Sequence, residues 1–130
     1  MKELLIETLS AFGYPVFLQG SMNENEAYPE SFFTFWNNSA DDMHHYDNEP
    51  IAFEWDFDVN FYSTDPILVN SVLVSTRNAL RAAGFAVNGK GHDVASDEPT
   101  HTGRGINAKI REENEEDEEE EYENENEEEE

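Results

Sequence analysis

The sequence predicts an α+β domain, in which an antiparallel-dominated sheet of about five strands carries two helices on one face. The first observation behind this prediction is the segment 51–62, IAFEWDFDVNFY, which alternates apolar and polar residues with the period of a half-buried strand. The second is the segment 65–83, whose apolar residues recur at the spacing of an amphipathic helix. Shorter runs on either side complete the predicted order α-β-β-β-α-β-β.

The N-terminal part contributes one helix and two strands. Apolar residues at helical spacing predict a helix over about 2–12, which Gly13 and Pro15 end. VFLQG at 16–20 predicts a short strand. SFFTFWN at 31–37 predicts a second strand with aromatic residues on both faces, so we expect it to be covered on both sides.

The segment 38–50 is polar and has no apolar period. It predicts a connection of about thirteen residues between two strands, which is longer than most connections in compact domains. A working loop or an arm is expected here.

The helix predicted over 65–83 has clear start and stop signals. Asp65 is a good N-cap, Pro66 fits the first turn, and Gly84 is a natural residue beyond the C-terminus. Two further strands are predicted at 85–87 and at about 101–110. The glycine-containing residues between these strands, GKGHDVASDEPTHTGRG, are expected to be mobile turns rather than a phosphate-binding loop, because no complete phosphate-binding motif is present.

The charge divides the chain into two parts. It has 31 acidic and 7 basic residues, and the last 19 residues hold 15 of the acidic ones and no basic one. Residues 1–111 are therefore predicted to form the domain, with a net charge of −9, and residues 112–130 a disordered acidic tail. The tail has three interpretations: a solubilising extension, a docking segment for a basic partner, or a mimic of nucleic-acid charge.

Composition excludes several classes of function. A surface that binds a polyanion needs many Lys and Arg residues, which this chain lacks. The absence of cysteine excludes disulfides, thiolate zinc sites and a cysteine nucleophile. No apolar run is long enough for a membrane span, and the N-terminal stretch is too interrupted by polar residues for a signal peptide. We expect a soluble protein.

The carboxylates of segment 51–62 are the first candidate site. The odd positions are expected to lie in the core under the helix over 65–83, so Glu54, Asp56 and Asp58 share the other face, about 6.6 Å apart. A metal site or a catalytic carboxylate pair is conceivable, but a straight row of carboxylates does not converge on a cation. The solvated side of a strand is the favoured interpretation. It leaves unexplained why one face carries a single sign of charge.

Histidines form the other candidate groups. His44 and His45 with Asp47, and His92 and Asp93 with His101, have residue types that bind zinc. Solvated loop histidines are the favoured interpretation of both groups. No nucleophile motif accompanies them, so the residues alone identify no catalytic constellation, no metal site and no cofactor site.

A resemblance adds to these inferences. The segments ESFFTFWNN, HYDNEPIAFEWDFDVNFYSTDPILVNSVL and AAGFAVNGKGHDVASDEPTHTGRGI resemble small tail proteins of siphophages and Gram-positive prophages, which are tail-completion, tail-terminator or tail-to-head joining proteins. The resemblance covers about residues 3–110, and the acidic tail departs from it. It implies a structural virion protein that forms a hexameric ring on the end of the tail tube, stops tube growth and meets the head connector. DNA would pass through the ring only as cargo.

The same resemblance implies where contacts would lie. The virion protein would be assembled in the host cytoplasm, with itself, the tail tube protein and a head completion protein as partners and no membrane. Candidate interface residues are Tyr28, Phe32, Trp36, His44, His45 and Tyr46. Glu54, Asp56 and Asp58 would lie on or near an acidic channel wall, and changing all three to lysine is expected to hinder DNA passage with little effect on folding.

Two other classes remain open at this point. An acidic mimic of DNA that inhibits a host nucleic-acid-binding protein would suit the charge, although more than half of the net charge lies in the tail. A small hydrolase that uses Glu54 and Asp58 or the histidines is the third hypothesis, and it requires a pocket over these side chains.

Overall fold

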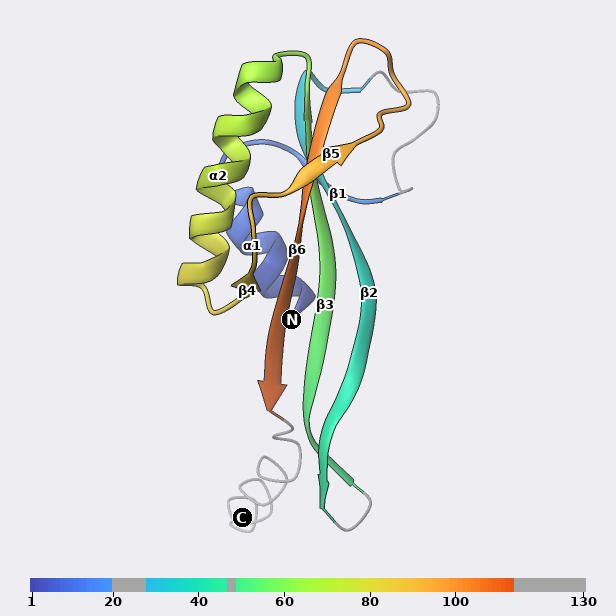
Figure 1. The fold of residues 1–130 in the computed structure, drawn as a ribbon, viewed down its shortest axis with the longest axis vertical. Coiled ribbons are helices and arrows are strands. Elements are labelled where there is room, and N and C mark those ends of the chain that lie inside the picture. The colour runs from blue at the N-terminus through green and yellow to red at the C-terminus, as the bar shows by residue number, and fades with distance from the viewer. Residues whose placement is uncertain (20–27, 47–48, 114–130) are drawn as a thin grey trace, which may run out of the picture.

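The computed structural model describes residues 1–19, 28–46 and 49–113, with the backbone alone for 43–46 and 49–51. The described chain forms a mixed sheet of six strands in the order β1-β2-β3-β6-β4, with β5 also paired to β6. Two helices pack on one face of this sheet, which confirms the predicted α+β class (Figure 1). Neither helix of this part of the chain could cross a lipid bilayer.

The N-terminal elements are close to the prediction. Helix α1 spans Lys2–Ser10 and buries Leu5 and Leu9. Strand β1, Val16–Leu18, pairs in parallel with β2, so the sheet is not purely antiparallel.

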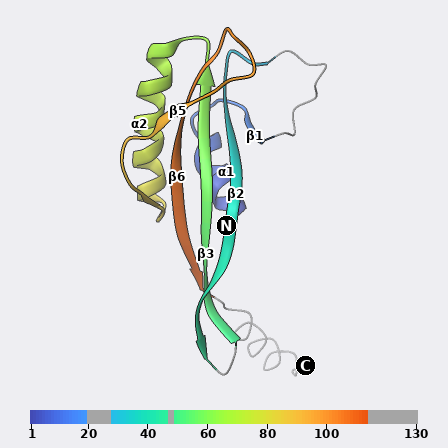
Figure 2. The same cartoon turned by 45° about the vertical axis from the view of Figure 1, so that its right-hand side comes forward.

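The predicted loop over 38–50 is wrong where the structure describes it. Strand β2 runs from Ser31 to Tyr46 and strand β3 from Glu49 to Ser63, so the two form one long antiparallel hairpin. Residues 47–48, and with them Asp47, lie outside the described residues. The segment carries no apolar alternation because it has no helix over it. Its backbone is held by pairing with β3 instead of by burial of side chains (Figure 2).

Helix α2, Pro66–Ala82, confirms the predicted helix. The Asp65 carboxylate accepts a hydrogen bond from the Ile67 amide (3.1 Å), and Pro66 occupies the first turn. Beyond the helix, Gly84 adopts φ +107°, a conformation that glycine permits without strain. The apolar stripe of the helix is buried as expected: Val69, Val72, Leu73, Thr76 and Leu80.

The C-terminal strands are more numerous than predicted. Strands β4 (Ala86–Val87) and β6 (Thr102–Glu113) match the two predicted strands, but β5 (His92–Val94) lies in the segment that we expected to be mobile turns. Pairing with β6 orders β5, and the Arg104 guanidinium adds contacts to the Asp93 carboxylate (2.8 Å) and the Gly91 carbonyl (3.0 Å). Strand β6 continues two residues past the predicted domain end at 111, whereas residues 114–130 lie outside the described residues.

The core lies between the helices and one face of the sheet. Among the odd positions of segment 51–62, Phe57, Val59 and Phe61 are fully buried, whereas Phe53 and Trp55 are only half-buried. Trp55 stacks on Phe57 at the border of the core, and the β2–β3 hairpin continues past the ends of both helices (Figures 1 and 2). The side chain of Ile51 lies outside the described residues.

Candidate interaction surfaces

We define the acidic stripe as Glu54, Asp56 and Asp58 of β3. It lies on the outer face of the sheet, which we define as the face turned away from the helices. Opposite residues of paired strands share a face, so the register places each carboxylate between a β2 residue and a β6 residue. The three rows are Trp36–Asp58–Asn107, Ser39–Asp56–Lys109 and Asp41–Glu54–Arg111.

Strand β6 supplies the partners of this stripe. The Asn107 amide donates to the carboxylates of Asp56 (2.6 Å) and Asp58 (3.2 Å). The Lys109 ammonium lies 3.9 Å from Asp56, which also accepts from the Asn38 amide (3.1 Å) at the bulge in β2. Lys109 and Asn107 of the neighbouring strand therefore compensate the charge of Asp56 and Asp58. Arg111 lies opposite Glu54 in the register, but its guanidinium pairs with Glu113. Only the register of β6, about fifty residues away in sequence, reveals this.

The structure does not assemble a metal site from its described residues. No group of three potential ligands among them could hold an ion. His92 lies opposite Gly105, Asp93 is paired with Arg104, and His101 hydrogen-bonds to the Pro29 carbonyl (2.8 Å) and lies 3.0 Å from the Thr100 hydroxyl. The side chains of His44, His45 and Tyr46 lie outside the described residues.

An aromatic cluster occupies the other end of the outer face. Phe32 stacks on Tyr62 (ring centroids 5.2 Å apart) and meets Tyr28 (5.5 Å) and His101 (5.8 Å) edge-on. Phe32 is 2% exposed, so it is packed within its own chain and is not available as an interface anchor. The expectation that both faces of strand 31–37 are covered is met here by aromatic side chains rather than by a second layer of helices.

The other two aromatic interface candidates remain at the surface. Tyr28 is half-buried, and its hydroxyl lies 3.4 Å from the Asp97 carboxylate. Trp36 is 49% exposed and stands next to the acidic stripe, opposite Asp58. Of the predicted anchors with described side chains, Trp36 presents the largest free apolar surface.

The aromatic cluster predicts a dependence of stability on alkaline pH. Burial raises the pKa of Tyr62, hydrogen bonding to Thr34 opposes this, and the charge of Asp97 adds to it. Because the folded state holds the phenol proton more tightly, this stabilisation is complete below the unfolded pKa and is lost as the pH rises through the folded pKa. As the pH rises above about 10, the ordinary pKa of a tyrosine, we expect the Tyr62→Phe variant to lose less stability than the parent chain. Urea unfolding at a series of pH values measures this, and equal losses in both chains would contradict it.

The hairpin beyond the helices forms a projecting arm, which we define as residues 38–46 of β2, 49–54 of β3 and 111–113 of β6 (Figure 1). Strand β1 pairs only with Phe33–Phe35, so the outer edge of β2 beyond them has no strand beside it in the described chain. Within the same limits, the outer edge of β6 is open beyond Lys109. The arm therefore offers unpaired backbone groups along both edges.

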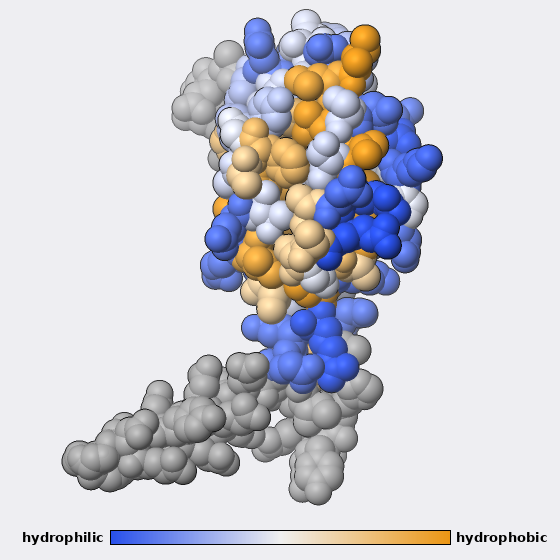
Figure 3. Space-filling view, turned by 90° about the vertical axis from the view of Figure 1, so that its left-hand side faces the viewer, coloured by the Kyte–Doolittle hydropathy of each residue, from blue (hydrophilic) through white to orange (hydrophobic). Residues whose placement is uncertain are grey.

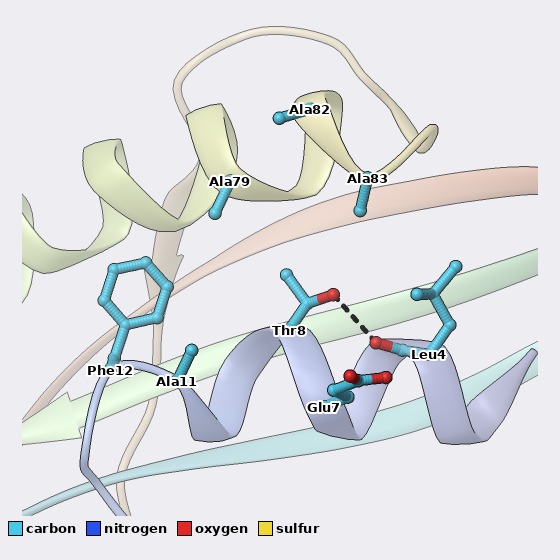
Figure 4. A pocket seen from close by; sticks show the side chains of 8 residues that line it. All are labelled: Leu4, Glu7, Thr8, Ala11, Phe12, Ala79, Ala82 and Ala83. Atoms are coloured by element: carbon cyan, nitrogen blue, oxygen red, sulfur yellow. Dashed lines mark hydrogen bonds between the residues drawn. The ribbon is translucent and has the colours of Figure 1, made fainter.

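A shallow groove lies between the two helices. It has a volume of about 470 Å³ and is open to solvent (Figure 4). The Thr8 hydroxyl donates to the Leu4 carbonyl (2.8 Å) and faces no histidine or other base in the lining. The residues that line the groove are Leu4, Glu7, Thr8, Ala11, Phe12, Ala79, Ala82 and Ala83. The lining contains one carboxylate, that of Glu7, whereas a catalytic pair needs two. The groove lies on the helical side of the sheet, and Glu54 and Asp58 lie on the outer face.

Apolar side chains also gather on the exposed side of the helical layer. Figure 3 shows patches of hydrophobic surface there among charged residues. Ile67 and Val74 of α2 and Ile6 of α1 contribute exposed apolar side chains. Scattered residues of this kind are ordinary for a protein surface.

Comparison of the chain with protein-family models and with curated proteins finds no match in either case.

Proposed function

We propose that this chain is a structural virion protein that caps the end of a phage tail tube and joins the tail to the head, as a hexameric ring through which DNA passes. The observation that carries the proposal is the arm with its two open edges. Unpaired N–H and C=O groups on an edge can pair with another chain. When one edge contacts a different edge of the next copy, the assembly closes into a ring if the rotation between copies allows it.

The charge of the outer face supports the same proposal. Five carboxylates occupy the arm side of this face and are accompanied by two cations. A surface with this excess of negative charge repels phosphates and would let DNA slide past it. The carboxylates are Asp41, Glu54, Asp56, Asp58 and Glu113, and the cations are Lys109 and Arg111.

The DNA-mimic alternative receives less support from the same face. A mimic needs a folded surface that presents regularly spaced, uncompensated negative charge. Asp56 and Asp58 instead share the Asn107 amide, and Lys109 lies beside Asp56. The remaining charge that a mimic would use lies mainly in residues 112–130.

A complementation experiment tests the proposal. We expect a phage in which this gene is disrupted to produce tails of abnormal length or heads without tails, as seen by electron microscopy. A wild-type copy should restore normal tails and infectivity. Normal tails in the disrupted phage would refute the proposed function.

A pair of exposed-surface variants adds a test of the interface. Trp36→Glu places a charge on the exposed indole position beside the arm, and we expect it to fold but to fail in complementation. Leu18→Glu is the matched control, because Leu18 is 44% exposed on β1, compared with 49% for Trp36. Equal rescue by both variants would show that Trp36 is not an interface anchor.

A further inference from the structure

Four of the seven Lys and Arg side chains have no ion pair within the described chain, and two of these four, Arg77 and Arg81, lie together on helix α2. The Arg104, Lys109 and Arg111 side chains each lie within 4 Å of a carboxylate. Arg77 and Arg81 have no ion pair among the described residues, and the Nε atom of Arg77 is buried without a hydrogen-bond partner there. Lys2 and Lys90 also have no ion pair in this part of the chain, and the Nε atom of Arg104 is likewise buried without a partner. What distinguishes Arg77 and Arg81 is that two unpaired cations are clustered on one helix, in a chain with 31 acidic and 7 basic residues.

The helix itself cannot neutralise this pair. The sequence of α2, PILVNSVLVSTRNALRA, contains no acidic residue, so neither arginine has a carboxylate one turn away. Arg77 and Arg81 are one turn apart on the side of α2 that is turned away from the groove with α1, whose α2 lining is Ala79, Ala82 and Ala83. They form a small cationic face near the C-terminal end of the helix, where the helix dipole also favours cations.

The strand that leads into the acidic tail passes beside the residue that follows α2. Gly84, which follows the C-terminal end of α2, lies beside β6, because a Cβ atom at this position would be 3.8 Å from the Ile110 side chain. Glu113 is three strand residues further on, which is about 10 Å. Residues 114–130 follow with thirteen carboxylates and no cation, and 17 residues can span up to about 56 Å. The tail is therefore long enough to reach Arg77 and Arg81 of its own chain.

We propose that residues 114–130 dock on the face formed by Arg77 and Arg81 of the same chain. Exposed ion pairs are individually weak, but attachment to the domain holds many carboxylates at high effective concentration next to two arginines. The docked tail covers a cationic face that would otherwise attract phosphates or acidic partners. The contact is electrostatic, so it weakens as salt is added. It rests on the charge distribution and does not depend on the proposed role in the tail.

A spin label tests where the tail lies. The chain has no cysteine, so Tyr122→Cys in the full-length protein provides one attachment site within the tail. At an ionic strength of about 0.01 M, where the Debye length is about 30 Å, we expect the label to broaden amide NMR signals of α2 around Arg77 and Arg81. The broadening should be lost at about 1 M, where the Debye length is about 3 Å.

Charge variants identify the contact. R77Q/R81Q should abolish the broadening over α2, whereas K2Q/K90Q removes the same charge elsewhere and should preserve it. A second measurement leaves the domain unchanged: replacing the acidic residues of 115–130 by their amides should shift the side-chain Nε–Hε signals of Arg77 and Arg81 and leave that of Arg104, which is paired with Asp93, in place.

Three results would overturn the proposal. The first is broadening that is centred away from α2 or is unchanged in R77Q/R81Q. The second is the absence of any shift of Arg77 and Arg81 when the tail is neutralised. The third is equal broadening in a mixture of spin-labelled chains and separate isotope-labelled chains, which would place the contact between copies.

Discussion

Phe33→Ala is expected to lower the free energy of unfolding by about 3–5 kcal/mol, a large share of the roughly 5–15 kcal/mol of a typical domain. Phe33 is fully buried, and its ring lies 4.8 Å from that of Phe61 and 6.0 Å from that of Phe12 (centroid distances). It joins the sheet to the segment that follows α1, so its removal leaves a cavity that several elements line. Cavities of this kind collapse only partly, which is why the loss exceeds the transfer free energy of the ring.

Urea unfolding followed by circular dichroism measures this effect. Trp36→Ala is the control on the same strand, because the indole is half-exposed and its loss should cost about 1 kcal/mol or less. If Phe33→Ala and Trp36→Ala were equally destabilising, the assignment of the core to the helix-covered face would be wrong.

Replacing Glu54, Asp56 and Asp58 together by lysine is expected to destabilise the fold by about 2 kcal/mol or more, because hydrogen bonds to charged groups contribute about 1.5–3 kcal/mol each. The register changes the expectation drawn from the sequence, in which this substitution had little effect on folding. The Asn107 amide would lose both of its carboxylate acceptors, and the new lysines would lie opposite Lys109 and Arg111. Like charges directly opposite in a sheet are destabilising.

The amide variant E54Q/D56N/D58N separates charge from contact. It preserves the shape of the side chains and creates no cation pair, so we expect a smaller loss of stability than for the lysine variant. Urea unfolding of both variants at low and high salt measures the difference, and salt should reduce the deficit of the lysine variant alone. Equal stability of the lysine variant and the parent chain would show that the β6 partners contribute nothing. Any effect on DNA passage should be judged with the amide variant, because it is closer to the native fold.

Local sequence patterns correctly predicted the helices and strands that are stabilised by burial of their own side chains. The helical period and the N-cap of α2 and the alternation of Phe57, Val59 and Phe61 led to the correct element types and the correct buried face. These patterns succeed because one face of each element is buried and the other is solvated, which leaves a period of 3.6 or 2 in the sequence.

The elements held by backbone pairing were not predictable in this way. The arm residues of β2 and the residues of β5 are mostly polar, so their sequences resemble loops, and only their partners on β3 and β6 make them strands. The strand register also determined which side chains surround the candidate site residues. It placed Phe32 in an intramolecular aromatic cluster and brought Asn107 and Lys109 to the acidic stripe.

By itself the sequence determined the α+β class, the two helices, the buried side of β3 and the concentration of acidic residues at the C-terminal end. The tertiary structure alone decided that the polar segment after Asn37 is part of a projecting arm, that the stripe has partners, and that Arg77 and Arg81 have no ion pair within the described residues. The physical reason is that hydrophobic periodicity is a pattern among residues that are close in sequence, so it can be read from the sequence. Strand pairing and charge neutralisation instead join residues that are far apart in sequence. Whether such residues meet depends on how the whole chain folds.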